Sequence, residues 1–149
     1  FGDKLHPAAY DSYNNDDSLK WILYQVASES NLHVFIGLDT CHKVEKVWGA
    51  EYWLVNSKEG NYCSKILELK GGHKSSIHYH NIKHETFVVL SGIVHINHSG
   101  VLHKCIAGDQ VEINTKDEHS FTSLYGDAYL LEVSTFHSDT DCIRLENSI

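Results

Sequence analysis

The sequence is poor in several residue types whose abundance would point to a partner or an environment. Among 149 residues there is one proline and no methionine, and of 12 basic residues only Arg144 is an arginine. With 20 acidic residues the formal net charge is −8, which argues against nucleic acid as a partner, because phosphate binding needs clustered lysine and arginine. No apolar run approaches the length of a membrane span, and no basic amphipathic segment suggests a membrane surface.

Cysteine is present, but not in a metal-binding or redox pattern. The four cysteines form no C-x-x-C pair and lie far apart, at Cys41, Cys63, Cys105 and Cys142. An even number of cysteines allows two disulfides, yet a domain of this size does not need them. We therefore expect reduced thiols in a cytoplasmic protein.

The length of the chain predicts one folded domain, which would bury about 70% of the surface that the unfolded chain exposes. The apolar content of 42% is ordinary for such a domain. One helical pattern stands out near the N-terminus. Asp16, Asp17 or Ser18 can act as its N-cap, and we expect a short helix from Leu19 to about Ser28.

From Leu32 onward the sequence has the pattern of an all-β protein. Short runs rich in Val, Ile, Tyr, Phe and Leu alternate with Gly, Asn, Asp and Ser. Hairpin turns are expected at Ser91-Gly92, Ser99-Gly100 and Tyr125-Gly126-Asp127. Many short strands with regular turns predict a closed sandwich or barrel. We place the strands at 33–37, 44–48, 50–56, 62–70, 75–80, 85–91, 93–97, 101–106, 110–113, 119–124, 127–135 and 142–145.

The most informative motif holds two histidines and a glutamate. On an extended strand, His78 and His80 point to the same face, so both can bind one ion. Residues 81–84 then predict a turn, and Glu85 opens a return strand that brings its carboxylate toward the imidazoles. Two nitrogens and one oxygen suit a divalent transition metal. The alternative is a hairpin without an ion in a chain that has 12 histidines.

This segment resembles the first motif of the cupin superfamily. The matching residues are Gly72, five residues, His78-x-His80, four residues, Glu85, six residues and Gly92. The resemblance implies an all-β double-stranded β-helix, the cupin jelly roll. It also implies that the ion is held inside the barrel by residues from several strands.

A second, looser resemblance lies further along the chain, at Gly108-Asp109, Ile113-Asn114 and His119-Ser120-Phe121. It implies that His119 is a fourth metal ligand; the alternative is a surface histidine that follows an acidic turn. Cupins usually carry a proline where Asn114 stands. A proline would pre-set a turn there, so the departure concerns the shape of this loop.

The flanking elements narrow the resemblance. The order of short elements along the chain resembles that of the C-terminal cupin domain of type II mannose-6-phosphate isomerases and of the related D-lyxose isomerases. The elements are Trp48-Gly49, the metal motif, Gly108-Asp109, His119, Glu132-Val133 and Asp141-Cys142-Ile143-Arg144. The resemblance covers about residues 44–147. It implies an N-terminal extension at 1–43 and a single cupin domain at 44–149, and we expect a homodimer because cupins commonly pair.

The resemblance implies an isomerase or epimerase of carbohydrate metabolism. A sugar or sugar phosphate would chelate one divalent transition metal ion, and the ion would stabilise an enediol as a carbon-bound proton leaves. The resemblance does not distinguish among Mn, Zn, Fe, Co and Ni. Fold alone does not name a reaction. Two alternatives therefore stay open: an iron-dependent cupin oxygenase and a non-catalytic sugar-binding module.

Two residues are candidates for proton transfer. Glu132 is the better carboxylate base if it points inward; alternation along its strand does not say which face it takes, so an exposed carboxylate is the alternative. Lys83 lies inside the predicted ligand turn, where it could orient a substrate oxygen or shuttle a proton. Its alternative is a solvated loop lysine.

Three further residues are candidates for substrate contact. Arg144 offers a planar guanidinium suited to phosphate or carboxylate, and the alternative is an ion pair with Asp141 or Glu146. His95 is the best placed of the remaining histidines to line the cavity, although such histidines are more often satisfied elsewhere. Trp48 could form a wall of a sugar site or belong to the core.

Overall fold

The computed structural model of the protein describes Leu38 and residues 41–149. The helix expected from Leu19 to about Ser28 and the strand expected at 33–37 lie outside the described residues, as does most of the expected extension at 1–43. His42–Ile149 form one compact unit. Among the described residues, no helix has the length and apolar character that crossing a bilayer requires.

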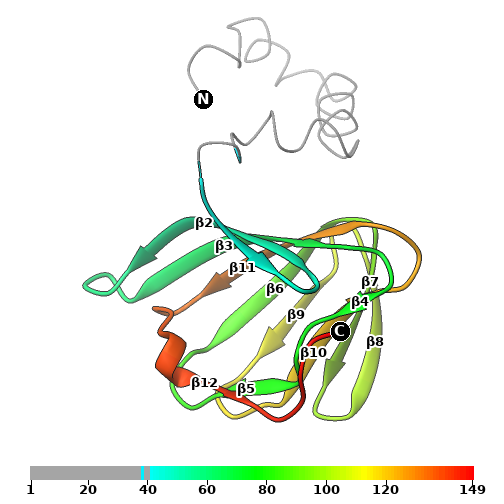
Figure 1. Cartoon of the computed structure of the whole chain (residues 1–149). Helices are drawn as coiled ribbons and strands as arrows, with labels where there is room; N and C mark the ends of the chain where they lie inside the picture. The colour runs from blue at the N-terminus through cyan, green and yellow to red at the C-terminus, as the bar shows by residue number, and fades with distance from the viewer. Residues whose placement is uncertain (1–37, 39–40) are drawn as a thin grey trace, which may run out of the picture. The chain divides into compact units, whose positions relative to one another are not determined.

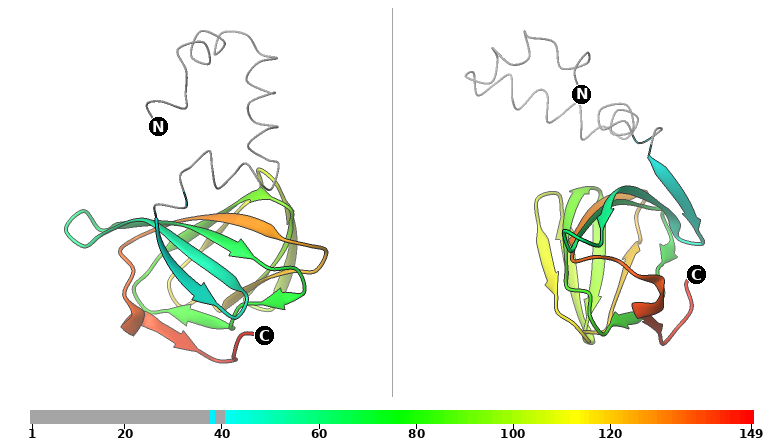
Figure 2. Two further views of the ribbon diagram at one scale, coloured as in Figure 1. Left: turned by 45° about the horizontal axis from the view of Figure 1, so that its top comes forward. Right: turned by 90° about the vertical axis from the view of Figure 1, so that its left-hand side faces the viewer.

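The described unit consists of two antiparallel six-stranded sheets that face each other (Figures 1 and 2). The first sheet contains, in spatial order, β1 (His42–Lys46), β2 (Gly49–Ser57), β3 (Tyr62–Leu69), β11 (Ala128–Ser134), β6 (Glu85–Ser91) and β9 (Gln110–Ile113). The second contains β12 (Cys142–Arg144), β5 (His78–His80), β10 (His119–Ser123), β7 (Ile93–His98) and β8 (Val101–Ile106), with β4 (His73–Lys74) also paired to β10. This is the predicted all-β jelly roll.

Alternation along the strands builds the interior between the two sheets. In β6, Phe87 and Val89 are buried while Val88 between them is partly exposed, and in β7 Val94 and Ile96 are fully buried. Burying one such side chain stabilises the fold by about 1.5–3 kcal/mol. The core they form joins both sheets and contains Trp48, Leu67, Leu69, Phe87, Val89, Val94, Ile96, Cys105, Ile113, Phe121, Ala128 and Leu130.

Of the three predicted hairpins, only one joins paired neighbours. Ser99 and Gly100 have φ of 51° and 83°, the two positive values that a type I′ hairpin between β7 and β8 needs. At Gly92 and at Gly126 the chain instead passes from one sheet to the other, so the hairpin predictions there are wrong. These two crossovers pack together, since a Cβ on Gly92 would lie 2.8 Å from the carbonyl oxygen of Asp127.

The strand expected at 75–80 is interrupted, which is a second correction. Lys74 pairs with Thr122, but His78 pairs with His119, so this side of the ladder carries one extra residue in the manner of a β-bulge. Ser75 occupies the break: its hydroxyl oxygen, rather than a carbonyl, accepts the N–H of Phe121 at 3.0 Å. The bulge sets the register in which His78 lies directly across from His119.

The thiols agree with the expectation drawn from the cysteine spacing. Cys63 and Cys105 are buried and Cys142 is partly buried, and all three carry free thiols. Burial is the main cause that raises the pKa of each of these thiols. They are therefore protonated and weakly nucleophilic at neutral pH.

Candidate metal centre and cavity

Three imidazoles and one carboxylate converge inside the jelly roll. His78 and His80 come from β5, His119 from the start of β10, and Glu85 from the start of β6 in the opposite sheet. One ligand atom from each residue lies within 4.8 Å of those of the other three. The antiparallel pairing of His78 with His119 and the tight turn at 81–84 bring the four groups together.

Hydrogen bonds outside this group orient two of the rings. His78 Nδ1 lies 3.0 Å from the carbonyl oxygen of Ser76, and His119 Nδ1 lies 3.0 Å from that of Asp117. A carbonyl oxygen can only accept, so Nδ1 carries the proton in both rings. The Nε2 lone pairs therefore point into the site, which is the usual arrangement for histidines that bind a metal.

Buried atoms at the centre lack hydrogen-bond partners. Glu85 Oε1 and His119 Nε2 are 2.8 Å apart, but neither has a hydrogen to donate, so two acceptors face each other. His80 Nε2 lies 3.6 Å from the same carboxylate oxygen. Leaving a buried polar atom unpaired costs about 1–3 kcal/mol. Metal–ligand bonds of about 2.0–2.2 Å place donors of one ion within about 4.4 Å of each other. The separations of 2.8 Å and 3.6 Å fall inside this limit, so Glu85, His119 and His80 fit a shared divalent cation.

The protonation states also suit metal binding. Burial lowers the pKa of His78 to about 3 and the pKa of His80 to about 4, so both rings are neutral near pH 7. Burial alone would raise the pKa of Glu85, but the neighbouring ammonium of Lys83 outweighs burial and holds that pKa low. Neutral imidazoles and an ionised carboxylate are the forms that bind a metal.

Lys83 lies beside this group and is buried. Its Nζ contacts Glu85 Oε2 and Glu132 Oε1 at 2.5 Å each, so one ammonium bridges a candidate metal ligand and the candidate base. Burial would lower the pKa of Lys83, but the two carboxylates raise it further than burial lowers it. The alternative of a solvated loop lysine is therefore wrong.

The turn that carries Lys83 is held by Asp141, a residue for which the sequence suggested no such role. The Asp141 carboxylate accepts the backbone N–H groups of Asn81 at 3.0 Å, Ile82 at 3.1 Å and Lys83 at 2.9 Å. This use of the carboxylate replaces the ion pair with Arg144 considered from the sequence. The Asp-x-Ile-Arg element drew attention to Asp141 in the sequence, but it did not predict that this carboxylate would bind the backbone N–H groups of residues 81–83.

Glu132 points inward from β11 and is buried. The hydroxyl of Ser134 donates to its Oε1 at 3.1 Å, and Lys83 contacts the same oxygen. Burial alone would raise the pKa of Glu132, whereas Lys83 and then Lys65 lower it, and the net effect is a lowered pKa. The alternative of an exposed carboxylate is wrong.

The asparagine that stands where cupins usually have proline closes its turn by hydrogen bonds. Asp117 Oδ2 accepts from the backbone N–H of Asn114 at 3.2 Å and from its side-chain amide at 3.3 Å. His98 Nε2 lies 2.8 Å from the same oxygen. Because the carbonyl of Asp117 orients His119, this turn supports the site without a proline.

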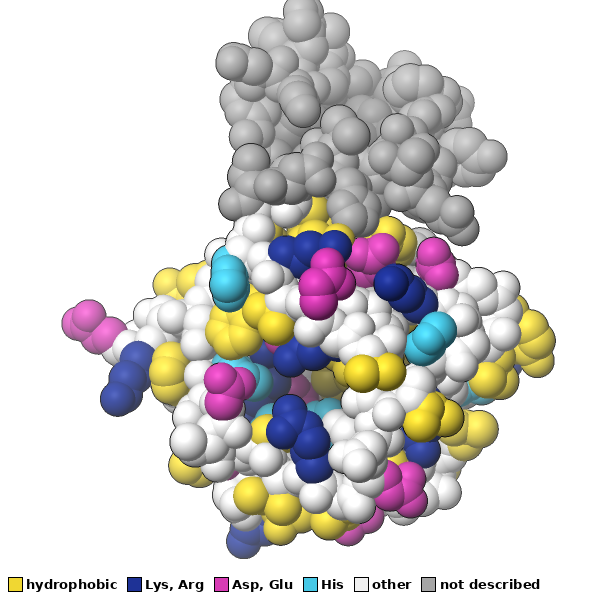
Figure 3. All heavy atoms as spheres, viewed as in Figure 1, with side chains coloured by type: hydrophobic (Ala, Val, Ile, Leu, Met, Phe, Trp, Pro, Cys, Tyr) yellow, Lys and Arg dark blue, Asp and Glu magenta, His cyan; other side chains and the backbone are white. Residues whose placement is uncertain are grey.

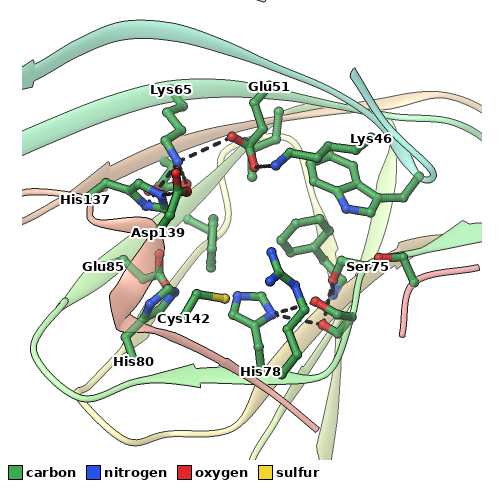
Figure 4. A pocket seen from close by; sticks show the side chains of 18 of the residues that line it. Lys46, Glu51, Lys65, Ser75, His78, His80, Glu85, His137, Asp139 and Cys142 are labelled. Atoms are coloured by element: carbon green, nitrogen blue, oxygen red, sulfur yellow. Dashed lines mark hydrogen bonds and ion pairs between the residues drawn. The ribbon is translucent and has the colours of Figure 1, made fainter. Parts of the chain in front are cut away.

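A cavity of about 290 Å³ opens onto the ligand group, the name used below for His78, His80, Glu85 and His119. Figure 3 shows the cavity as a hollow with histidine and basic side chains in and around it. In Figure 4, His78 and His80 lie on one side of the cavity and Lys65 and Glu51 on the other. The lining includes His78, His80, Lys83, Glu85, Glu132, Arg144, Trp48, Phe121, Cys142, Lys46, Glu51, Lys65, His137 and Asp139.

The three residues expected to contact a substrate take different positions. Arg144 lines the cavity with an exposed side chain, and Trp48 lines it while also packing edge-to-face on Phe121 at 5.0 Å, so it is both wall and core. His95 does not line the cavity. The alternation of β7 points Val94 and Ile96 into the core and His95 to the other face, which corrects the prediction for His95.

Sequence reasoning missed Lys65 and His137. Lys65 is 1% exposed and its Nζ lies 3.2 Å from His137 Nδ1. The sequence did contain a signal for Lys65. Residues two apart on a strand share a face, and Lys65 lies two residues from Cys63 and from Leu67, both of which face the interior. No comparable pattern marks His137, which follows β11 in an irregular segment.

No protein-family model matches the chain, and no curated protein matches it significantly. Solved structures do match. KdgF from Halomonas sp. has a TM-score of 0.56 at 13% identity, covering 61% of this chain and 81% of its own. Oxalate decarboxylase from Bacillus subtilis has a TM-score of 0.63 at 22% identity, with 72% and 31% covered. The capsular polysaccharide assembling protein CapF from Staphylococcus aureus has a TM-score of 0.61 at 19% identity, with 71% and 34% covered.

These neighbours are cupin-fold proteins, so the chain has the cupin fold that the sequence predicted. The chain spans about a third of the decarboxylase and of CapF. At these identities the likeness concerns the fold alone. The closer resemblance to type II mannose-6-phosphate isomerases and D-lyxose isomerases stays a prediction.

Proposed function

We propose that the protein is a metal-dependent isomerase or epimerase that moves a carbon-bound proton on a sugar or sugar phosphate. The observation that carries the proposal is the position of Glu132. This buried carboxylate lines the same cavity as the ligand group and does not belong to that group. A non-catalytic binding module would have no need of a separate proton acceptor at this position.

His78, His80, Glu85 and His119 would hold the ion. When bound, a divalent ion would act as a Lewis acid on the carbonyl oxygen and the neighbouring hydroxyl of the sugar. The donor set suits several first-row ions and does not select among Mn, Zn, Fe, Co and Ni. The imidazoles of His78 and His80 are neutral because their pKa values are lowered, so neither needs to lose a proton before it binds the ion.

Glu132 would take the proton from the carbon next to the carbonyl. The electron pair of that carbon–hydrogen bond forms the carbon–carbon double bond of a cis-enediolate, while the π pair of the carbonyl moves onto its oxygen. Glu132 then returns the proton to the adjacent carbon, and the proton of the neighbouring hydroxyl passes to the former carbonyl oxygen. Lys83 holds Glu132 Oε1 at 2.5 Å and keeps the carboxylate ionised, which is the form a base needs. General acid–base catalysis of this kind contributes about 10²–10⁴-fold.

The cavity supports a small polar substrate. A volume of about 290 Å³ is at the small end of ligand pockets, which suits one monosaccharide unit rather than a polymer. Trp48 offers an aromatic wall. No described residue forms an ion pair with Arg144, so its guanidinium is available for a phosphate or carboxylate at the opening. Of the similar structures, one is named for oxalate and one for a capsular polysaccharide.

Deuterium exchange tests the proposal. Purified protein, with its metal content measured, is incubated in D₂O with pentoses, hexoses and their phosphates. We expect solvent deuterium at C1 or C2 of at least one sugar without oxygen consumption. Glu132→Gln should abolish exchange while the metal content stays unchanged. Glu112→Gln, which alters an exposed carboxylate paired with His84, is the control.

No exchange across the panel in any metal form would overturn the proposal. Iron-dependent oxygen consumption in place of exchange would favour the oxygenase alternative. Binding of a sugar with no turnover would favour the non-catalytic module. The expected homodimer and cytoplasmic location belong to the same proposal, and the molar mass of the purified protein in solution tests the first.

A further inference from the structure

A second polar cluster lies in the cavity beyond the ligand group, around the ammonium of Lys65 (Figure 4). Lys65 Nζ is 3.2 Å from His137 Nδ1, 3.5 Å from Glu51 Oε2 and 4.0 Å from Glu132 Oε2. It also lies 4.1 Å from the centre of the Trp53 ring. Lys65 therefore lies between the candidate base and His137, whose ring packs edge-on against His80 with the two centroids 6.3 Å apart.

The cluster continues from His137 to solvent. His137 Nε2 lies 3.2 Å from Asp139 Oδ1, and the Asp139 side chain is 97% exposed whereas that of Lys65 is 1% exposed. The His137 backbone is fixed by Asn56, which accepts its N–H at 2.9 Å and donates to its carbonyl oxygen at 3.0 Å. A row of polar groups thus runs from the buried carboxylate to the surface.

The hydrogen bonds in this row have a defined direction. An ammonium can only donate, so Lys65 donates to His137 Nδ1, and Nε2 carries the ring proton toward the Asp139 carboxylate. Because Nδ1 accepts from Lys65 and Nε2 donates to Asp139, the ring is neutral in this arrangement. A neutral ring that accepts at one nitrogen and donates at the other can pass a proton along.

We propose that Lys65, His137 and Asp139 form a proton relay that connects Glu132 with solvent. The inference rests on the proposed function, in which Glu132 holds a substrate-derived proton between two carbons. The relay allows that proton to be replaced by one from water. Glu51 positions its first member, since Glu51 Oε2 lies 3.5 Å from Lys65 Nζ and also accepts from Trp53 Nε1 at 3.1 Å.

Each transfer balances. In the outward direction, Lys65 gives a proton to His137 Nδ1, His137 Nε2 gives one to Asp139 or its hydrating water, and the Lys65 amine takes the proton from Glu132 Oε2. The 4.0 Å between Lys65 and Glu132 exceeds a hydrogen bond, so this step requires a rotation of the lysine side chain. The inward direction reverses each transfer. One outward and one inward passage restore every donor and exchange one proton for a solvent proton.

The simpler reading of the cluster is a set of ion pairs that neutralises Glu51 and Glu132. That reading explains Lys65, but it gives no function to the contact between His137 and the exposed Asp139. It predicts that changes at His137 and Asp139 alter stability alone. A relay predicts that they alter where the transferred hydrogen comes from.

The test measures isotope partitioning in the full chain loaded with its metal. A sugar deuterated at the migrating position is converted in H₂O, and the product is analysed for retained deuterium. Wild type should lose much of the label to solvent. His137→Gln and Asp139→Asn should still convert the sugar but retain several-fold more label, because the substrate-derived hydrogen cannot leave Glu132. Asp139→Asn alters an exposed side chain, so it keeps the test valid if the buried change impairs folding.

Glu112→Gln is the matched control, since Glu112 and His84 form a comparable but exposed pair at 2.8 Å. It should leave label retention at the wild-type value. Equal retention in wild type, His137→Gln and Asp139→Asn, with conversion intact in all three, would overturn the relay and leave the proposed function standing. Absence of conversion in wild type would overturn the proposed function and the relay with it.

Discussion

Replacing Lys83 by methionine tests how much the buried ammonium of Lys83 contributes to the stability of the protein. Lys83→Met keeps most of the side-chain volume but removes the ammonium that contacts Glu85 and Glu132 at 2.5 Å each. Both carboxylates are buried, so neither can recover its solvation. Removing one partner of a buried ion pair costs about 3–5 kcal/mol. We expect the free energy of unfolding of the metal-free protein to fall by about that amount near pH 7.

The loss should depend on pH in a defined way. The pKa of Lys83 is raised, so its contribution is present below the unfolded-state pKa of about 10.4 and is lost as pH rises through the folded-state pKa. The pKa of Glu132 is lowered, so its contribution is present above the unfolded-state pKa of about 4.3 and is lost as pH falls through the folded-state pKa. The difference between wild type and Lys83→Met should therefore be largest between about pH 4.3 and pH 10.4.

Urea unfolding followed by tryptophan fluorescence measures this difference. The control is Lys74→Met, because Lys74 and Glu146 form a more exposed pair at 3.5 Å, whose loss should cost about 0–1 kcal/mol. Adding Glu132→Gln to Lys83→Met should recover part of the loss, since one unpaired charge disappears. A cost for Lys83→Met no larger than that of the control would refute the reasoning.

Two further predictions concern the turn and the histidines. Asp141→Ala removes the acceptor for three backbone N–H groups of the turn at 81–84. It should lower the free energy of unfolding in urea by at least about 2 kcal/mol and should also weaken metal affinity. A variant that loses metal affinity but keeps the wild-type free energy of unfolding would contradict the proposed support of the turn. The pKa values of His78 and His80 are lowered to about 3 and about 4, so the unfolded state binds more protons below pH ~6.5 and stability should fall as the pH drops through this window. In the metal-free protein, His78→Gln should reduce that slope by up to about 1.4 kcal/mol per pH unit, and an unchanged slope in pH-dependent unfolding would argue against a buried neutral His78.

Local pattern predicted the strands well because burial on one face enforces alternation. The expected ranges 85–91, 101–106 and 110–113 coincide with β6, β8 and β9. The metal motif could be predicted from the sequence for the same reason, since side chains at i and i+2 of a strand share a face. The ligand group therefore followed from spacing, and from the cupin resemblance in the case of His119.

Contacts between distant segments were not predictable from local pattern. Lys65 and His137 are 72 residues apart in sequence, and Asp141 reaches the N–H of Asn81 across 60 residues. The turn residues at Gly92 and Gly126 indicated reversals, but only the sheet pairing shows that the chain changes sheets there. The inward direction of Glu132 likewise depended on its register against β3 and β6.

Metal stoichiometry tests the central claim most directly. Elemental analysis of protein purified without added chelator should find one divalent transition metal ion per chain. The ion should be lost in His119→Ala, which removes a buried ligand atom that has no hydrogen-bond partner. It should be retained in His103→Ala, which alters an exposed histidine of β8. A folded wild-type protein that binds no such ion when divalent metals are supplied, or a His119→Ala variant that binds it as tightly, would contradict the account.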